Sequence, residues 1–60
     1  PDSKYFVGSI VNHKKYGRGQ IVRFELASNE KENDKVIIRF DVDNVDRVFP
    51  RVSLNKDLFS

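Results

Sequence analysis

The residues of this sequence that could do chemistry are one histidine, a short series of aspartates and two closely spaced glycines. His13 is the single histidine and cysteine is absent, so the chain lacks the four Cys or His ligands that a structural zinc ion takes. Without a second ligand or a nucleophile beside it, His13 does not support metal binding or nucleophilic catalysis. Because it precedes a glycine turn, we expect its ring nitrogens to bond backbone groups of that turn.

Two further spacings resemble ligand-binding motifs without completing them. Asp41 and Asp43 are spaced like the first two ligands of a calcium loop, but Val45 stands at the next ligand position, Asp46 replaces the glycine that should follow, and no glutamate closes the run. The glycines of residues 17–19 lead into an expected strand, whereas a phosphate-binding loop leads into a helix. We predict no catalytic residue, metal, cofactor or small-molecule substrate. A structural turn is predicted instead, built by His13, Tyr16, Gly17 and Gly19.

Basic side chains gather around the same glycines. Residues 12–23 carry several basic side chains and no acid, and cations interleaved with an aromatic ring are typical of nucleic-acid grooves. Nucleic-acid binding is therefore one open alternative, through His13, Lys14, Lys15, Tyr16, Arg18 and Arg23. An aromatic cage for a methylated side chain needs several converging rings. Most of the available rings are more simply explained as core or core-edge residues; the rings are those of Tyr5, Phe6, Tyr16 and Phe49.

Length and composition limit the class of protein. The chain has 60 residues, a length that predicts one small domain. Its formal net charge of +2 is too small to indicate a nucleic-acid partner by itself. The sequence has no apolar run near the roughly 18 residues of a membrane span and no signal-peptide start. We expect a soluble protein, and the absence of cysteine fits the cytoplasm. Because the sequence starts at Pro1, we expect a piece of a longer protein.

The elements that would position these side chains are short β-strands. Apolar residues never hold a helical period over about ten residues, and β-branched and aromatic residues cluster between turn formers. Strands are predicted over residues 8–13, 20–26, 35–40, 45–49 and 58–59, with a 3-10 turn at 51–54. Ile21 is out of phase with Val22 and Phe24, which predicts a bulge near the start of the second strand. Pro50 is expected to end the fourth strand.

Two polar segments are expected to connect the longer strands. Residues 28–34 are fully polar and predict an exposed hairpin loop, while residues 41–44 predict a turn. A sheet this small leaves long unpaired edges unless it bends and closes. We therefore predict an all-β, five-stranded barrel over residues 7–60, preceded by an N-terminal extension or linker over residues 1–6, with a core held by packing alone.

Part of this pattern resembles a known family. The small Tudor-like domain at the C-terminus of UvrD/PcrA-type DNA helicases, like related small bacterial barrel modules, is similar to this chain in two segments. These are the stretch from Gly8 to Val22, centred on residues 13–19, and the strand at 35–40. The resemblance covers residues 7–59 and includes the ending Val48-Phe49-Pro50, Leu54, Leu58 and Phe59. It implies an SH3/Tudor-like barrel that serves a DNA-repair helicase as an accessory domain, docks on RNA polymerase and can contact DNA.

The leading functional prediction is a non-catalytic protein-interaction surface. In the helicase domains, the strand that matches residues 45–48 carries a basic pair implicated in the polymerase contact. Asp46 replaces the first of these residues and Arg47 keeps the second. The preceding strand starts with Lys35 where the family often has an acid, so we expect a different partner or a partner with exchanged charges.

We place this surface on two neighbouring strands, with an edge strand that could accept a partner strand. Ile37 and Val48 are expected to form its apolar centre. The predicted partner-binding residues are Lys35, Ile37, Arg39, Asp46, Arg47 and Val48. Besides nucleic-acid binding, a purely structural role within a larger enzyme is the other open alternative.

Overall fold

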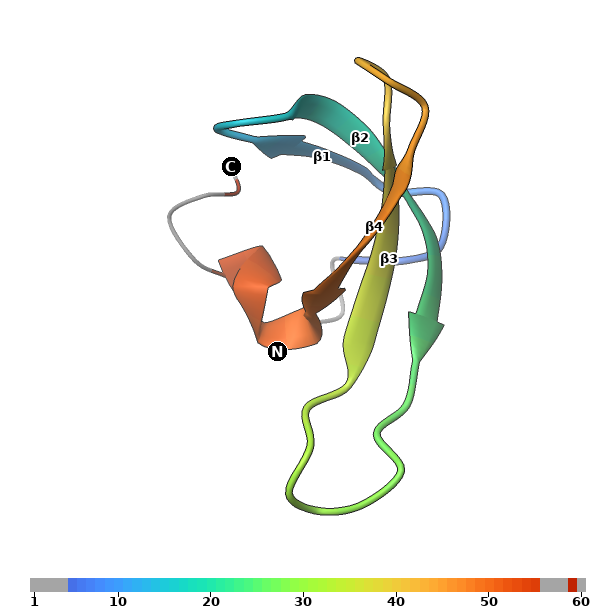
Figure 1. The fold of residues 1–60 in the computed structure, drawn as a ribbon, viewed down its shortest axis with the longest axis vertical. Coiled ribbons are helices and arrows are strands. Elements are labelled where there is room, and N and C mark those ends of the chain that lie inside the picture. Colours follow the sequence, from blue (N-terminus) through green and yellow to red (C-terminus); the bar gives the residue numbers. More distant parts are fainter. Residues whose placement is uncertain (1–4, 56–58, 60) are drawn as a thin grey trace.

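A computed structural model describes residues 5–55 and residue 59, which form an antiparallel β-sheet followed by one 3-10 turn (Figure 1). The strands β1 (Ile10–His13), β2 (Gly17–Glu25), β3 (Lys35–Phe40) and β4 (Asp46–Pro50) are neighbours in the sheet in the order of the sequence. The 3-10 turn η1 (Arg51–Asn55) follows β4 directly. The prediction of an all-β chain with a 3-10 turn near its C-terminal end is confirmed.

The sheet is open among the described residues, whereas we expected a closed barrel of five strands. Residues 5–55 and 59 contain four strands, of which β1 and β4 form the two edges. Where the fifth strand was expected, Phe59 makes an isolated antiparallel bridge with His13, and residue 58 lies outside the described residues. Pro50 is the last residue of β4 instead of its terminator. An edge strand tolerates proline because the missing N–H can face away from the ladder.

β2 bends at the bulge that its sequence predicts. The register against β3 shifts between Ile21 and Arg23, so Val22 is the extra residue. As a result Ile21 and Phe24 both face the core although three positions separate them, and Arg23 faces the opposite side. Leu26, which we expected inside this strand, lies beyond its end and is exposed.

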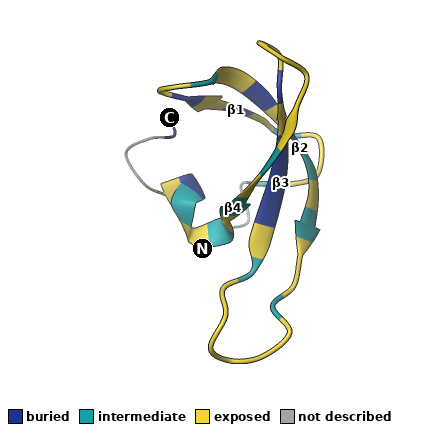
Figure 2. Ribbon diagram, viewed as in Figure 1, coloured by how far each residue is buried: buried dark blue, intermediate teal, exposed yellow. Residues whose placement is uncertain are grey.

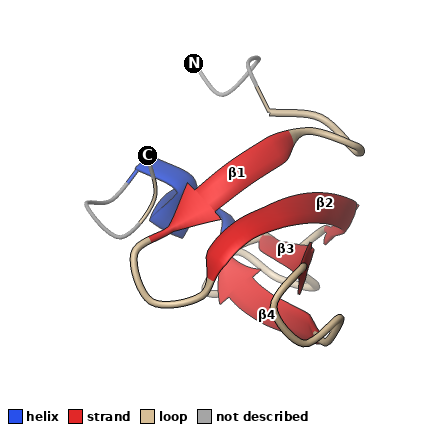
Figure 3. Ribbon diagram, turned by 90° about the horizontal axis from the view of Figure 1, so that it is seen from above, coloured by secondary structure: helices blue, strands red, loops and turns tan. Residues whose placement is uncertain are grey.

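The core lies on one face of this bent sheet. β3 is buried along most of its length (Figure 2), and η1 lies on the side toward which the sheet curves (Figure 3). The buried cluster consists of Val11, Ile21, Val36, Ile38, Phe40, Leu54 and Phe59. Tyr5 packs against it and donates its hydroxyl hydrogen to the Leu54 carbonyl oxygen over 3.2 Å. Tyr5, a residue of the expected N-terminal extension, thus contacts the core.

The connections hold the strands through a few local bonds. In the loop between β2 and β3, the Asp34 carboxylate accepts the Ala27 N–H at 2.8 Å, and the Asp34 carbonyl accepts the Arg51 N–H at 2.7 Å. In the turn between β3 and β4, Asn44 has a φ of 58° and donates its N–H to the Phe40 carbonyl at 2.7 Å. Asparagine adopts this left-handed conformation more readily than most residues. Within the described part of the chain, no helix has the length and apolarity to cross a membrane.

Candidate interaction surface

The face of the sheet opposite the core carries three rungs of paired side chains, which we call the outer face. Each rung consists of three residues that lie side by side, one each from β2, β3 and β4, and is written in that order. Except for Ile37, all of them are exposed. The rungs are Glu25–Lys35–Pro50, Arg23–Ile37–Val48 and Gln20–Arg39–Asp46.

Paired charges give the outer face a fixed pattern. Arg39 donates from Nε to Asp46 Oδ1 at 2.7 Å and from Nη2 to Asp46 Oδ2 at 3.2 Å. The hydrogen bond from Arg39 lowers the pKa of Asp46, and the charges of Arg39 and of nearby Arg23 lower it further. Arg23 also pairs with Glu25 at 3.1 Å. Lys35 makes no ion pair with any of the described residues, so it is the uncompensated cation of this face.

The apolar part of the outer face is smaller than we expected. Val48 is 56% exposed, but Ile37, expected to share the apolar centre with it, is only 1% exposed. Ile37 is the middle residue of its rung and lies on a central strand between Arg23 and Val48. Long charged side chains cover neighbouring apolar groups with their methylene stems while their heads stay in water. Ile37 therefore stabilises the sheet, and Val48 is the apolar side chain open to a partner.

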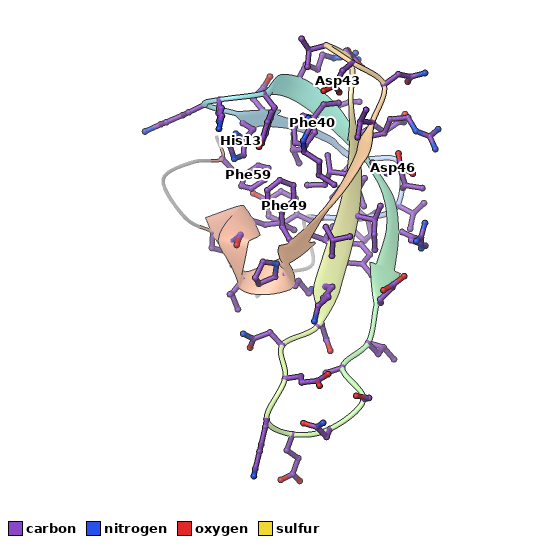
Figure 4. All side chains as sticks on the ribbon, viewed as in Figure 1. His13, Phe40, Asp43, Asp46, Phe49 and Phe59 are labelled. Carbon is purple, nitrogen blue, oxygen red and sulfur yellow. The ribbon has the colours of Figure 1, made fainter. Side chains whose placement is uncertain are left out.

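Arg47 is separated from the other predicted partner-binding residues. Successive side chains of a strand point to opposite faces, and Arg47 pairs with Ile38 of the core. Its guanidinium lies 4.1 Å from the centroid of the Tyr16 ring and donates two hydrogen bonds to Asp43. Figure 4 shows Asp43 near the end of the hairpin that connects β3 and β4. The outer face thus keeps Lys35, Arg39, Asp46 and Val48 as exposed members of the predicted set.

His13 serves the turn between β1 and β2. His13 is 6% exposed, and its Nδ1 accepts the N–H of Lys15 at 2.9 Å and that of Tyr16 at 3.3 Å. Burial, followed by the charge of Lys15, lowers the pKa of His13. Because Nδ1 accepts both hydrogen bonds, a neutral His13 ring must carry its proton on Nε2. Gly17, with a φ of 81°, ends this turn, and Gly19 is buried against the core.

The basic residues predicted to bind nucleic acid are only partly brought together. Lys14 and Lys15 are exposed on the turn, and Lys15 Nζ lies 5.6 Å from the centroid of the half-buried Tyr16 ring. Arg18 pairs with Asp41 at 2.7 Å. Arg23 lies five positions further along β2, roughly 16 Å for an extended chain, and belongs to the outer face. His13 itself is buried.

The aromatic side chains form a packed cluster and not an open cage. Ring centroids of Tyr16 and Phe49 lie 4.8 and 5.6 Å from that of His13, and Phe40 and Phe59 complete the cluster (Figure 4). Of the other two rings considered for a cage, Tyr5 packs against the core and Phe6 is 62% exposed. The Arg47 guanidinium already covers the Tyr16 ring.

A hollow adjoins the outer face between the N-terminal turn and the hairpin turn. It has a volume of about 460 Å³ and is lined by Val7, Gly8, Gln20, Ile21, Val22, Arg39, Asp41 and Asn44. Its two charged side chains are each paired, Arg39 with Asp46 and Asp41 with Arg18. Within residues 5–55 and 59, no three His, Cys, Asp or Glu side chains form a group that could hold a metal ion. Both charged side chains that line the hollow are therefore already paired within the chain.

Comparison with protein families, curated proteins and solved structures gives no match to this chain. The chemistry of the outer face is thus the basis for any functional assignment.

Proposed function

We propose that this domain is a non-catalytic protein-interaction module that binds its partner through the outer face. One observation carries the proposal: η1, Phe59 and the packed rings all lie against one side of the sheet, while the opposite side presents exposed side chains on three adjacent strands. A broad, shallow surface of this kind suits a protein partner better than a small substrate, which binds in a concave pocket.

The side chains of the outer face support recognition of a protein. The Arg39–Asp46 pair is bidentate and holds both charges in place before a partner arrives, which lowers the entropy lost on binding. Charges of both signs favour one arrangement of complementary groups and disfavour others. Val48 supplies an apolar contact beside them, and Lys35 supplies a free cation.

The resemblance to the helicase domains suggests the larger setting. On that basis we propose an accessory domain of a cytoplasmic bacterial DNA helicase or another DNA-processing protein, docking on RNA polymerase. The bridge between Phe59 and His13 supports a fifth strand beside β1 that would complete an SH3/Tudor-like barrel. Asp46 in place of a basic residue predicts that the complementary site on the partner differs in charge from that of the helicases.

Nucleic-acid binding is the second candidate. Lys14 and Lys15 lie side by side in the sequence, are exposed and make no ion pair with described residues. Two lysines neutralise few phosphates, so the affinity should be low and should fall with salt.

The test compares binding of the chain to bacterial RNA polymerase core enzyme and to duplex DNA by biolayer interferometry. We expect Lys35→Glu and Val48→Glu each to weaken polymerase binding about tenfold or more. Lys31→Glu in the loop between β2 and β3 is the matched control for charge. Val52→Glu, at a position 50% exposed against 56% for Val48, is the control for an exposed valine.

Each outcome of that comparison has a separate meaning. Polymerase binding that survives both outer-face substitutions would refute the assignment of this face. Binding to DNA that is lost in a Lys14→Ala, Lys15→Ala double variant, with no polymerase binding, would favour the second candidate.

A further inference from the structure

We infer that β4 accepts an extended segment of another protein as an additional strand, paired with the backbone of Asp46 and Val48. This inference rests on the proposed function, because it specifies how a partner engages the edge of the outer face. The argument concerns backbone groups, whereas the outer face was assigned from side chains.

The hydrogen bonds at the two ends of the β3–β4 pair fix which backbone groups face the open edge. The Phe40 N–H donates to the Val45 carbonyl at 3.4 Å, and the Arg51 N–H donates to the Asp34 carbonyl at 2.7 Å. Antiparallel partners alternate between bonded and non-bonded pairs. Continuing the alternation along the observed register makes Ile38–Arg47 and Val36–Phe49 the bonded pairs.

Arg47 and Phe49 therefore direct their N–H and carbonyl groups toward β3. Asp46 and Val48 direct theirs toward the free edge, where the backbone bonds found outside the strands in the described part of the chain do not reach them. Pro50 is the next residue in this series and has no N–H to donate. The edge thus offers complete donor and acceptor sets at two positions, which an added segment of about three residues would cover.

The side chains at this edge leave it open to pairing. Edge strands are commonly protected by charged side chains, but the charges here are neutralised within the chain, that of Asp46 by Arg39 and that of Arg47 by Asp43. Val48 follows these two charged residues on the edge strand, and its apolar side chain is 56% exposed. Because β-branched and aromatic residues pair well across strands, we expect a residue of this kind opposite Val48 in the partner segment.

The same geometry disfavours a second copy of this chain as the occupant. Antiparallel pairing about a twofold axis at Arg47 would set the two Arg47 side chains opposite each other, and an axis at Asp46 would oppose two aspartates; like charges in these positions are destabilising. With the axis at Val48, Asp46 would face Pro50, and each such pair would lack one N–H donor. The edge is suited to a strand of different sequence.

The test removes a single N–H while every side chain is kept. A chain of 60 residues can be made by chemical synthesis with the Val48 amide replaced by an ester. The matched control is the same replacement at Ile10 on the other edge. The Ile21 N–H donates to the Ser9 carbonyl, so by the same alternation the Ile10 N–H also points outward.

The probe is a peptide of about ten residues, selected from a displayed random library on the immobilised wild-type chain. Its affinity is measured by fluorescence polarisation for the wild type, both ester variants and Lys35→Glu. We expect the Val48 ester to bind about tenfold more weakly and the Ile10 ester to bind like the wild type. As a second measurement that does not depend on folding of the ester variant, hydrogen exchange of the wild type should show the Val48 amide exchanging fast in the free chain and slowly in the complex.

Three results would overturn the inference, and they separate it from the proposed function. If the Val48 ester binds normally and Lys35→Glu does not, the outer face binds the peptide but strand addition is refuted. If no peptide is selected, or if both esters and Lys35→Glu bind like the wild type, the inference and the outer-face assignment both fail. If the Val48 amide becomes protected as the concentration of the free chain rises, the occupant is a second copy.

Discussion

The guanidinium of Arg47 lies 4.1 Å from the centroid of the Tyr16 ring, and Asp43 accepts two hydrogen bonds from it at 2.7 and 3.1 Å. The neighbouring residue Asp46 forms a similar bidentate pair with Arg39 on the outer face. The side chain of Arg47 is 27% exposed and that of Arg39 is 51% exposed. Two ion pairs of the same chemistry, on opposite faces of one sheet, therefore have different roles: the first covers the edge of the core and the second faces solvent.

We expect Arg47→Ala to lower the thermal unfolding midpoint by about 4 °C or more, because a loss of about 1 kcal/mol of unfolding free energy shifts the midpoint of a small domain by about that much. Arg39→Ala should lower it less, because exposed ion pairs contribute little. Arg47→Lys should restore only part of the loss, since a lysine neither stacks flat on the ring nor forms the bidentate pair. Thermal denaturation followed by circular dichroism measures all three, and equal midpoints for the two alanine variants would contradict the assignment.

Ile37→Ala should cost about 2 to 5 kcal/mol of unfolding free energy, the range for buried isoleucine. Ile37→Val should cost about 0.5 to 1.5 kcal/mol. Val48→Ala should cost less than either, because Val48 is 56% exposed. Urea denaturation gives these values. If Ile37→Ala unfolds at the wild-type midpoint, Ile37 is not the covered centre of the outer face.

The strand at 35–40 shows what periodicity can predict. Alternation of Val36, Ile38 and Phe40 indicates a central strand, and the structure places β3 between β2 and β4 with these three residues in the core. Alternation also assigns Ile37 to the other face. It does not show that Ile37 is buried on that face, because its neighbours there are Arg23 of β2 and Val48 of β4, which are distant from Ile37 in the sequence.

The candidate site was less predictable because its residues depend on long-range pairing. The run at 45–49 does not alternate cleanly between polar and apolar residues, so the face of Arg47 could not be read from it. Similarly, Arg18 is neutralised by Asp41, which is 23 positions away. The backbone bonds of His13 are different: their donors are residues of the turn that directly follows it, so the sequence was sufficient to predict that the ring bonds this turn, although not that Nδ1 is the acceptor.

Gly19→Ala should destabilise the chain by about 1 to 3 kcal/mol, as overpacking of a core does. A Cβ atom at this position would lie 2.8 Å from Ile38 Cγ2 and 2.8 Å from Phe40 Cδ1. Gly17 has open space around it but a φ of +81°, so Gly17→Asn should be tolerated better, because asparagine accepts the left-handed region. Urea denaturation compares the two variants, and a smaller loss for Gly19→Ala than for Gly17→Asn would contradict this packing.

The stability of the chain should fall as the pH drops below about 6.5, the ordinary pKa of histidine. A protonated His13 ring cannot accept the N–H bonds of Lys15 and Tyr16, and burial lowers its pKa in the folded chain. Between the unfolded and the folded pKa the unfolded chain therefore binds more protons, and stability rises with pH at no more than about 1.4 kcal/mol per pH unit. Urea midpoints measured from pH 7.5 down to pH 4.5 test this.

His13→Asn separates this titration from that of the carboxylates. Hydrogen bonds from Arg47 and Arg39 lower the pKa values of Asp43 and Asp46 below 3.8, so their contribution to stability is complete above 3.8 and is lost only at more acidic pH. An asparagine side chain can still accept the N–H two residues ahead but does not titrate. The variant should lose stability through the missing ring, and its stability should be nearly constant between pH 6.5 and pH 4.5. A slope equal to that of the wild type would show that another group is responsible for the acid sensitivity.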